Sequence, residues 1–350
     1  MAEDTAPAVL KSRVDAVLRA FVDREVEQLL EIDPELALVA EQLRAATAHG
    51  KRLRAAFCYW GWRASGQPDG EGALRAAAAI ELVHAAAVVH DDLIDRSRLR
   101  HGRPTAQWAL RGRLVRRARP AAAAEALAML AGDLLMAWAG QLFADCGLPG
   151  AFLSRARPLW AVLARELVAG ECLEVLRTGA GPDTAASLQI VRYKTAKYTV
   201  EHPLLIGAAL GGTPVGRRES LSAYGLPLGE AFQLRDDLLG LFGDPERTGK
   251  ENADDLTARR PTVLLAETWR CATAAERAEL RRLLGGVGQD AATVGRVREI
   301  MHRTRAPARV EQMIDERVRA ATSALAGLWL PRQAEQALAE LAEAATSRHR

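Results

Sequence analysis

Cysteine and long apolar runs are scarce in this chain of 350 residues. Its four cysteines, Cys58, Cys146, Cys172 and Cys271, show no CxxC spacing. We therefore expect the four cysteines to be small core residues of a protein in the reducing cytoplasm, and not parts of disulfides or of a zinc site. The sequence has no run of about 18 uncharged apolar residues, and its polar N-terminus lacks the apolar core of a signal peptide. These absences predict a soluble, cytoplasmic protein without a transmembrane segment.

A strong net charge and several common catalytic motifs are absent as well. The 47 basic and 44 acidic side chains leave a formal net charge of +3, which is too balanced to predict nucleic-acid binding. The chain has no nucleotide-binding glycine loop, no GxSxG and no HExxH, which disfavours α/β-hydrolase and zincin chemistry. Alanine and leucine dominate while β-branched residues are sparse, so we predict an all-α fold.

Apolar residues recur at three- and four-residue spacing along much of the chain, the pattern of amphipathic helices. Turn signals separate these stretches. The segment 106–120 is rich in arginine and is expected to be an irregular surface excursion. The predicted helices cover 8–31, a stretch up to about 47, a third helix from Lys51, a central helix ending near 95, 121–145, 151–178, 184–210, 217–241 and a series over 263–348.

The most distinctive stretch is 80–105, IELVHAAAVVHDDLIDRSRLRHGRPT. Its uninterrupted apolar part predicts a buried helix that ends in three carboxylates, Asp91, Asp92 and Asp95. If the helix reaches position 95, Asp91 and Asp95 share one face and repel each other unless a cation lies between them. Mg²⁺ with oxygen ligands suits that place. A solvated acidic helix end, balanced by the arginines that follow, is the alternative.

A second acidic segment, QLRDDLLGLFGD at 233–244, places Gln233, Asp236 and Asp237 on another apolar helix. Two such segments in one chain favour a cavity with metal on two walls over two solvated helix ends. No pair of nucleophile and base stands out near either segment.

Basic side chains occur in several separate places. Lys51 and Arg54 lie near the start of a predicted helix, where cations oppose the helix dipole unless an anion intervenes. Lys194 and Lys197 lie three residues apart, so one helix face offers two ammonium groups. For both pairs, ordinary solvent-facing side chains are the alternative. The loop 243–262 adds Lys250 and is a candidate to close over a substrate.

Carboxylates, hard metal ions and scattered cations together favour a ligand that carries several phosphate charges. The metal would neutralise the charge that develops on a departing diphosphate. The surrounding apolar helices would hold the organic part of the ligand. A diphosphate ester with a long hydrocarbon tail therefore fits both halves of the pattern.

In the order of its motifs, the chain resembles the trans-isoprenyl diphosphate synthases of the polyprenyl synthetase family, including geranylgeranyl diphosphate synthases. The similarity covers roughly residues 20–300. The matching motifs are GKRLR at 50–54, ELVHxxxxxHDDLID at 81–95 with RxGRPT to 105, KTAKYT at 194–199, and FQLRDDLLGLFGD with TGK at 232–250. The resemblance implies one domain over 1–350, with C-terminal helices at 301–350, folded as a single large antiparallel helical bundle around a central cavity.

The resemblance also implies roles for the acidic residues. Asp91 and Asp95, supported by Asp92, match the ligands of two Mg²⁺ ions, and Asp236 matches the ligand of a third. Asp237 and Gln233 surround that third site. The implied cofactor is therefore Mg²⁺, with three ions in each active site.

Basic residues and hydroxyls match the parts of the family's site that hold the substrates. The cations that hold the allylic diphosphate match Arg100, Lys194 and Lys250. The pocket for the diphosphate of isopentenyl diphosphate matches Lys51, Arg54 and His84. Thr195 and Tyr198 match positions beside the reacting carbons. For His84 alone, a core histidine with a hydrogen bond is the alternative.

The implied chemistry is a head-to-tail condensation. Departure of the allylic diphosphate leaves an allyl cation, the double bond of isopentenyl diphosphate attacks it, and a proton is then lost. The departing diphosphate is a candidate base for that proton. The family typically dimerises, so a homodimer is expected, with isopentenyl and allylic diphosphates as ligands and no nucleic acid.

Three positions depart from the family pattern. Gly240 replaces the last carboxylate of the second acidic motif, which predicts weaker metal binding, with Asp244 as partial compensation. His101 follows Arg100 where a second arginine is usual, which predicts weaker or pH-dependent binding of isopentenyl diphosphate. Glu171 and Glu174 stand where glutamine and aspartate are usual.

Product length is predicted from the residues before Asp91. Ala87 and Ala86, four and five residues earlier, are not aromatic, so they build no floor under a growing chain. We predict geranylgeranyl diphosphate or a somewhat longer product, with farnesyl or a much longer product as alternatives. Further alternatives are a class I terpene cyclase, against which GKRLR and KTAKYT argue, and a non-catalytic prenyltransferase subunit, against which the three aspartates argue. The remaining alternative is a helical protein that mediates protein interactions.

Overall fold

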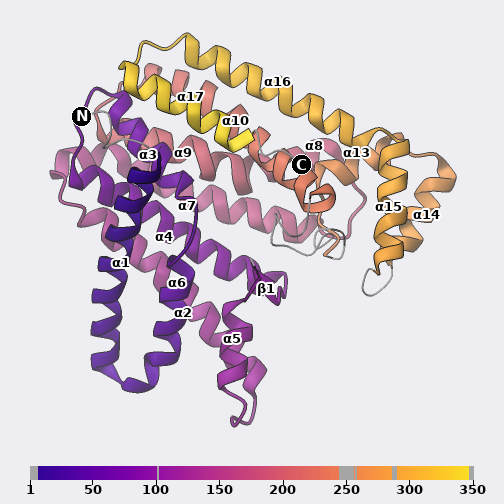
Figure 1. Ribbon diagram of the computed structural model, residues 1–350, viewed down its shortest axis with the longest axis horizontal. Helices are drawn as coiled ribbons and strands as arrows, with labels where there is room; N and C mark the ends of the chain where they lie inside the picture. The colour runs from indigo at the N-terminus through magenta and orange to yellow at the C-terminus, as the bar shows by residue number, and fades with distance from the viewer. Residues whose placement is uncertain (1–6, 101, 244–255, 257, 286–289, 347–350) are drawn as a thin grey trace. The chain divides into compact units, whose positions relative to one another are not determined.

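A computed structural model describes residues 7–100, 102–243, 256, 258–285 and 290–346, and most of these residues lie in helices (Figure 1). The strands within these ranges are β1 (Leu99–Arg100) and β2 (Arg103–Pro104), which form one antiparallel hairpin. The prediction of an all-α fold is confirmed. The chain divides into two compact units: unit 1 is Met1–Pro158 with Pro203–Thr213, and unit 2 is Leu159–His202 with Pro214–Arg350. One domain over 1–350 stays a prediction.

Unit 1 is built mainly from helices of the first half of the chain. The predicted helices at 8–31, up to 47 and at 121–145 are all present, each within a few residues of its predicted bounds. The elements of unit 1 are α1 (Pro7–Ile32), η2 (Pro34–Leu36), α2 (Ala37–Thr47), α3 (Leu53–Ala64), α4 (Glu71–Ile94), the hairpin, α5 (Ala106–Arg113), α6 (Pro120–Ala144), the start of α7 (Gly150–Arg177) and most of α9 (His202–Leu210).

Helices α1 and α2 form an antiparallel pair, visible as the indigo helices of Figure 1. The buried side chains of α1, among them Val14, Leu18 and Val22, recur at four-residue spacing, so one face is apolar. The Asp33 side chain caps η2 by accepting a hydrogen bond from the Glu35 N–H at 2.7 Å. Asp33 and Pro34 therefore lie where α1 gives way to η2.

Helix α3 begins at Leu53 and not at Lys51, so the predicted start was two residues too early. The reason is the backbone of Arg52, which adopts the left-handed conformation with φ of 55° and so cannot be part of the helix. Helix α3 then packs directly on α9. A Cβ added at Gly61 would lie 2.1 Å from the Leu204 carbonyl oxygen, so the two backbones touch where glycine allows it.

Helix α4 is the central helix of unit 1 and packs against α6 along its length. At Gly132 of α6, an added Cβ would lie 2.2 Å from the His90 ring, so glycine admits that ring between the helices. By length and composition α4 and α6 could each cross a membrane, although both contain charged residues. The apolar 18-residue stretch of α4 is 72% buried within the protein, and the corresponding stretch of α6 is 44% buried. We therefore interpret α4 as a core helix, whereas α6 presents apolar surface.

The segment 106–120 is less irregular than predicted, because its first eight residues form helix α5. Leu110 and Leu114 are buried against Ala124 and Ala128 of α6, and this apolar contact holds the helix in place. The prediction relied on the many arginines of the segment and gave no weight to these two leucines. The remainder of the segment leads into α6, which begins at Pro120.

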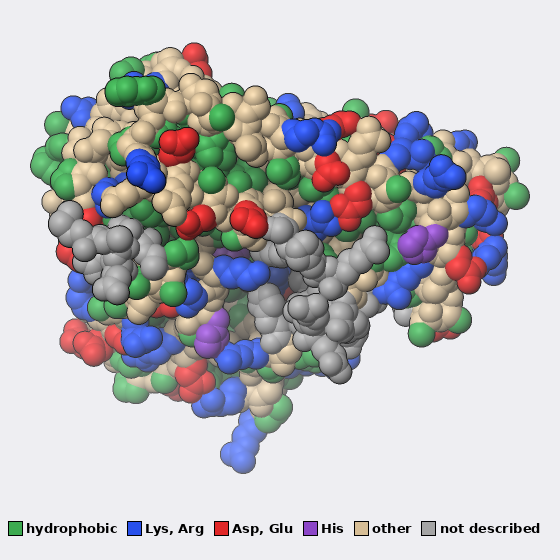
Figure 2. All heavy atoms as spheres, turned by 45° about the horizontal axis from the view of Figure 1, so that its top comes forward, with side chains coloured by type: hydrophobic (Ala, Val, Ile, Leu, Met, Phe, Trp, Pro, Cys, Tyr) green, Lys and Arg blue, Asp and Glu red, His purple; other side chains and the backbone are tan. Residues whose placement is uncertain are grey.

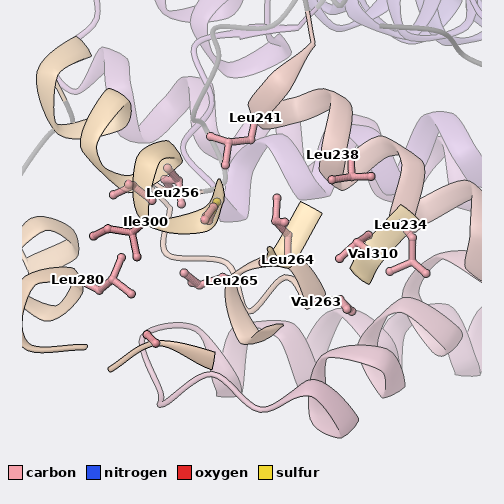
Figure 3. Packing of buried hydrophobic residues seen from close by; sticks show 14 of the residues in the cluster. Leu234, Leu238, Leu241, Leu256, Val263, Leu264, Leu265, Leu280, Ile300 and Val310 are labelled. Atoms are coloured by element: carbon pink, nitrogen blue, oxygen red, sulfur yellow. The ribbon is translucent and has the colours of Figure 1, made fainter. Parts of the chain in front are cut away.

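Unit 2 contains the rest of α7 and the helices that follow it, apart from most of α9. Its core gathers leucines of α10 with apolar residues of α13, α15 and α16 (Figure 3). The predicted helices at 151–178 and 217–241 correspond to α7 and α10. The remaining elements are α8 (Thr184–Ile190), η3 (Val191–Glu201), α10 (Val215–Phe242), α13 (Val263–Cys271), α14 (Ala274–Gly285), α15 (Ala291–Arg303), α16 (Ala306–Ala326) and α17 (Arg332–Thr346).

The stretch predicted as one helix at 184–210 is three consecutive helices, α8, η3 and α9. The middle one, η3, is a π-helix of 11 residues that carries the KTAKYT motif. Sequence periodicity does not distinguish a π-helix from an α-helix over so short a range, which explains the difference. π-Helical turns within helices are often found at functional sites.

Charged side chains of both signs are interspersed over the described part of the face in Figure 2. This mixture agrees with the near balance of 47 basic and 44 acidic residues. Net charge therefore says little about ligands here, and local arrangements of charge carry the argument.

Candidate functional site

The aspartates of the first motif lie at the C-terminal end of α4. The helix ends at Ile94, and Asp95 follows as its cap with a helical backbone. The Asp95 N–H donates to the Asp91 carbonyl at 2.9 Å, so these two residues keep the one-turn spacing that the sequence predicted. Asp92 is buried and the Asp91 side chain is 17% exposed. Carboxylates so far removed from water need positive partners.

Arg100 provides such a partner. It lies on β1, which the tight turn at Gly102, with φ of 72°, joins to β2. The Arg100 Nη2 lies 2.9 Å from the Asp91 Oδ2, and its Nε lies 2.8 Å from the Asp92 Oδ1. Burial alone would lower the pKa of Arg100, but Asp92 and Asp91 outweigh it and raise the pKa above its usual value. One guanidinium thus bridges both carboxylates.

The donor atoms at this end of α4 suit a hard divalent cation. They are carboxylate oxygens of adjacent turns, and two of them already converge on one positive charge. Mg²⁺ binds such oxygens and keeps part of its water shell. Asp91, Asp92 and Asp95 therefore fit the predicted metal, provided that Arg100 shifts part of its bonding to a phosphate.

The GKRLR segment contributes Lys51, which is exposed, and Arg54, which is partly buried. Between them lies Arg52, whose side chain is buried and donates to the Asp15 Oδ1 at 2.6 Å and to the Thr47 carbonyl at 2.5 Å. Arg52 therefore anchors the segment and does not face a ligand. Sequence inspection missed this role because three basic residues within four positions look alike.

Glu81 of α4 supports the same segment. Its side chain is buried and accepts the Ala55 N–H at 2.9 Å, one of the free donors in the first turn of α3. His84 lies one turn further along α4 and is partly buried. Lys51, Arg54 and His84 thus all belong to unit 1, on α4 and around the start of α3.

In unit 2, Lys194 of η3 lies between two glutamates of α7. Its Nζ is 2.6 Å from the Glu174 Oε1 and 2.9 Å from the Glu171 Oε2. A Cβ at Gly170 would lie 2.3 Å from the Lys194 backbone nitrogen, so glycine is what lets α7 and η3 approach this closely. The segment GECLE thereby fixes the ammonium group of the KTAKYT motif.

The second acidic motif lies on α10, which also packs tightly on η3. A Cβ at Gly229 would lie 2.5 Å from the Ala196 carbonyl oxygen. Further along α10, the Gln233 Nε2 donates to the Asp237 Oδ1 at 2.7 Å, and Asp237 is buried. Asp236 is partly buried on the same helix. The structure thus joins Gln233 to Asp237 across one helical turn.

Unit 2 also offers oxygen donors suited to a cation. The Glu171 Oε1 is buried and accepts no hydrogen bond from the residues that the structure describes. A buried acceptor without a donor is costly, and a bound cation or its water would satisfy it. Separately, Asp236 and Asp237 on α10 carry carboxylate oxygens of the same kind, which suit the hard metal that the sequence predicted for the second motif.

A second charged network lies beside this one. Lys197 of η3 is 3.0 Å from the Glu166 Oε2 and 3.8 Å from the Glu201 Oε2. The His202 Nε2 is 2.7 Å from the Glu166 Oε2, and Glu201 also accepts the Ser222 hydroxyl. Sequence reasoning missed Glu166 and His202, which carry no motif of their own.

Several predicted residues remain to be placed. Thr195 lies on η3 between Lys194 and the buried Ala196, and Tyr198 is buried on the same helix. On α4, Ala86 is fully buried and Ala87 is partly exposed. The predictions for His101, Asp244 and Lys250 lie outside the described residues.

Comparison with known proteins gives a family. The model of the family described as polyprenyl synthetase matches residues 37–303. A nonaprenyl diphosphate synthase of Mycobacterium tuberculosis is 30% identical over 98% of this chain and 99% of that protein. A (2E,6E)-farnesyl diphosphate synthase of the same organism is 38% identical over 222 residues, which are 63% of this chain and 56% of that relative's length. The chain thus aligns with little more than half of that relative.

A solved structure is similar over nearly its whole length. It is a geranylgeranyl pyrophosphate synthase from Corynebacterium glutamicum in complex with isoprenyl diphosphate and magnesium. It is 31% identical, covers 98% of each chain and has a TM-score of 0.92. The names of the relatives span several product lengths, so similarity alone leaves the product length open.

The charged network around Glu166 predicts a pH-dependent contribution to stability. Burial raises the pKa of Glu166, but the hydrogen bonds from His202 and Lys197 outweigh it and hold the pKa below its usual value. A carboxyl with a depressed pKa stabilises the fold above its unfolded pKa of about 4.3, and the gain is lost as the pH falls through the folded pKa. Glu166→Gln should therefore cost about 1 kcal/mol near neutral pH and much less at acid pH.

Urea unfolding of both proteins over a pH series checks this prediction. Glu31→Gln, which changes an exposed carboxylate of α1, is the matched control and should show little difference at any pH. A gap between wild type and Glu166→Gln that stays constant down to strongly acid pH would contradict the role given to Glu166.

Proposed function

This chain belongs to the polyprenyl synthetase family, and from that premise we propose that it is a trans-prenyltransferase. It condenses isopentenyl diphosphate head-to-tail with an allylic diphosphate and yields an all-trans polyprenyl diphosphate. The observation that carries the proposal is the family match over 37–303, a range that contains every proposed site residue from Lys51 to Lys250. We also propose that it acts in the cytoplasm.

Unit 1 supplies the first set of metal ligands and the cations of one diphosphate site. Asp91 and Asp95 hold Mg²⁺ with Asp92 in support, and Arg100 passes from the carboxylates to the allylic diphosphate when that ligand binds. The bidentate geometry of its guanidinium suits either partner. The diphosphate of isopentenyl diphosphate is held by Lys51, Arg54 and His84, with His101 as a further substrate-binding residue.

Unit 2 supplies the second set of metal ligands and further cations for the allylic diphosphate. Asp236 holds a further Mg²⁺, with Asp237 and Gln233 beside it, and Lys194 and Lys250 bind the allylic diphosphate. Before substrate binds, Glu171 and Glu174 keep the Lys194 ammonium in place. This arrangement pre-orients a cation for the leaving group at little cost at the moment of reaction. Thr195, next in the chain, borders the reacting carbons.

Bound Mg²⁺ would supply the charge neutralisation that lets the allylic C–O bond break. The ammonium of Lys194 and the guanidinium of Arg100 stabilise the negative charge that grows on the departing diphosphate. The double bond of isopentenyl diphosphate then forms the new C–C bond, and the departing diphosphate takes up the proton that is lost. The absence of a third carboxylate at Gly240 weakens the second metal site without removing Asp236.

Product length is proposed from α4. Ala86 is fully buried by the protein, whereas Ala87 is partly exposed and so has open space on one side. Small residues at this depth leave room for a chain longer than farnesyl. We propose geranylgeranyl diphosphate or a somewhat longer product.

Incubation with Mg²⁺, isopentenyl diphosphate and dimethylallyl, geranyl or farnesyl diphosphate in turn tests the activity. We expect elongation of at least one primer, with products sized by mass spectrometry, and none after chelation of the metal. Asp91→Asn should lower kcat by about a hundredfold to a thousandfold, because it removes a charge that acts on the leaving group through the metal. Asp23→Asn, on the exposed surface of α1, is the control and should be near wild type. Failure to extend any primer would overturn the proposal.

Ala87→Phe tests the product length. The aromatic ring would fill the space beside α4 and should shift the main product to a shorter chain, with elongation of the shortest primer retained. Ala46→Phe, at a partly exposed alanine of α2, is the control and should leave the product unchanged. An unchanged product from a well-folded Ala87→Phe enzyme would show that the tail does not run past this position.

A homodimer is the proposed assembly, and α6 is the proposed interface. Its exposed side includes Met129 and Leu130, which are 49% and 54% exposed, and the small residue Ala137. Exposed apolar side chains on a helix that is otherwise packed in the core commonly mark a protein interface.

Light scattering after gel filtration measures the assembly. Wild type should have the mass of two chains, and Leu130→Glu should have the mass of one, because it places a charge in the apolar contact. Leu176→Glu makes the same change at an exposed leucine of α7 and should remain dimeric. A monomeric wild type, or a dimeric Leu130→Glu, would refute this interface.

A further inference from the structure

A cluster of arginines that the proposed reaction does not use lies at the end of α5 and in the turn that leads to α6. Within 111–119 the chain has five arginines, and no aspartate or glutamate occurs from 96 to 124. All five side chains are exposed. The five residues of this arginine cluster are Arg111, Arg113, Arg116, Arg117 and Arg119.

The carboxylates that face this cluster neutralise it weakly. The Arg113 Nη1 lies 2.8 Å from the Glu41 Oε2, and the Arg117 Nη2 lies 3.7 Å from the Glu35 Oε2. All four side chains are at least half exposed, so solvent and salt screen these pairs. The cluster therefore presents a positive surface to solution.

An apolar side chain lies at the tip of the same segment. The Arg117 N–H donates to the Leu114 carbonyl at 2.9 Å, which closes a turn with Val115 and Arg116 at its centre. Val115 is 69% exposed, although the burial of Leu114 against α6 holds the turn in a fixed position. A valine so exposed, between arginines, costs free energy in water.

Behind the turn lies a cavity of about 690 Å³. One wall comes from Leu36, Leu38 and Val39, and the other from Leu114 and the alanines at the start of α6. The charged residues of its lining are Glu35, Arg117 and Arg119. The size is that of a site for a small apolar ligand, and it opens beside the positive surface.

We propose that this arginine cluster, with Val115 and the cavity behind it, docks the protein on a membrane that contains anionic phospholipids. The arginines bind lipid phosphates, Val115 enters the acyl layer, and the cavity accepts part of one acyl chain. Electrostatic attraction combined with a short apolar insertion is how peripheral proteins hold anionic bilayers. A nucleic acid would satisfy the arginines but would leave Val115 and the cavity without a role. The inference does not rest on the proposed reaction, since binding to lipid requires no catalysis.

Sedimentation of the full chain with vesicles tests the proposal. Vesicles of phosphatidylcholine with phosphatidylglycerol should bind the protein, and vesicles of phosphatidylcholine alone should not. The triple variant R116S/R117S/R119S should bind about a hundredfold more weakly, at about fivefold for each arginine. Val115→Asp should bind at least about tenfold more weakly because it opposes insertion.

Two controls separate this surface from charge in general and from misfolding. R282S/R319S/R332S removes the same charge from exposed positions of unit 2 and should bind as wild type does. Circular dichroism melting and condensation of a short primer in solution should be the same for every variant, because none of these residues belongs to the proposed site.

Three results would overturn the proposal. They are equal binding to both kinds of vesicle, an arginine triple variant that binds like wild type, and a Val115→Asp variant that keeps full vesicle binding. The last result, together with equally tight binding of duplex DNA, would identify the cluster as a general polyanion site.

Discussion

A charged side chain that is buried away from water needs a partner of opposite charge, and this constraint shapes the functional parts of both units. Asp91 and Asp92 share the guanidinium of Arg100, and Lys194 lies between Glu171 and Glu174. In the proposed function, each pairing includes a group that exchanges its partner for a phosphate or a metal ion. The same pairing that stabilises these buried charges therefore prepares them for a charged ligand.

Not every buried ion pair serves a ligand. Glu230, buried on α10, binds both Arg192 and Arg317 and so ties η3 and α16 to that helix. Arg52 ties the start of α3 to α1 through Asp15. These pairs hold elements at fixed distances, which gives the exchangeable pairs a rigid frame. Removal of one partner would leave a buried charge without compensation.

Glycine supplies the close distances on which these pairs depend. Gly170 and Gly229 let α7 and α10 touch the backbone of η3 from two sides, and a Cβ at either would overlap η3. The Lys194 ammonium reaches both glutamates only because α7 comes so near. In the sequence these glycines look like weak points within helices. In the fold they are the points where helices meet.

Periodicity and local spacing depend on near neighbours, so the amino-acid sequence predicted the helical class, most helix positions and the residues of both acidic motifs. The hydrogen bond between Gln233 and Asp237, one turn apart, was found only in the structure. The tertiary structure alone decided that Arg52 is buried beside Asp15, that 106–113 is a helix seated on α6, and that η3 is a π-helix fixed by Gly170 and Gly229. These features depend on contacts between residues distant in the chain, and local pattern carries no record of such contacts.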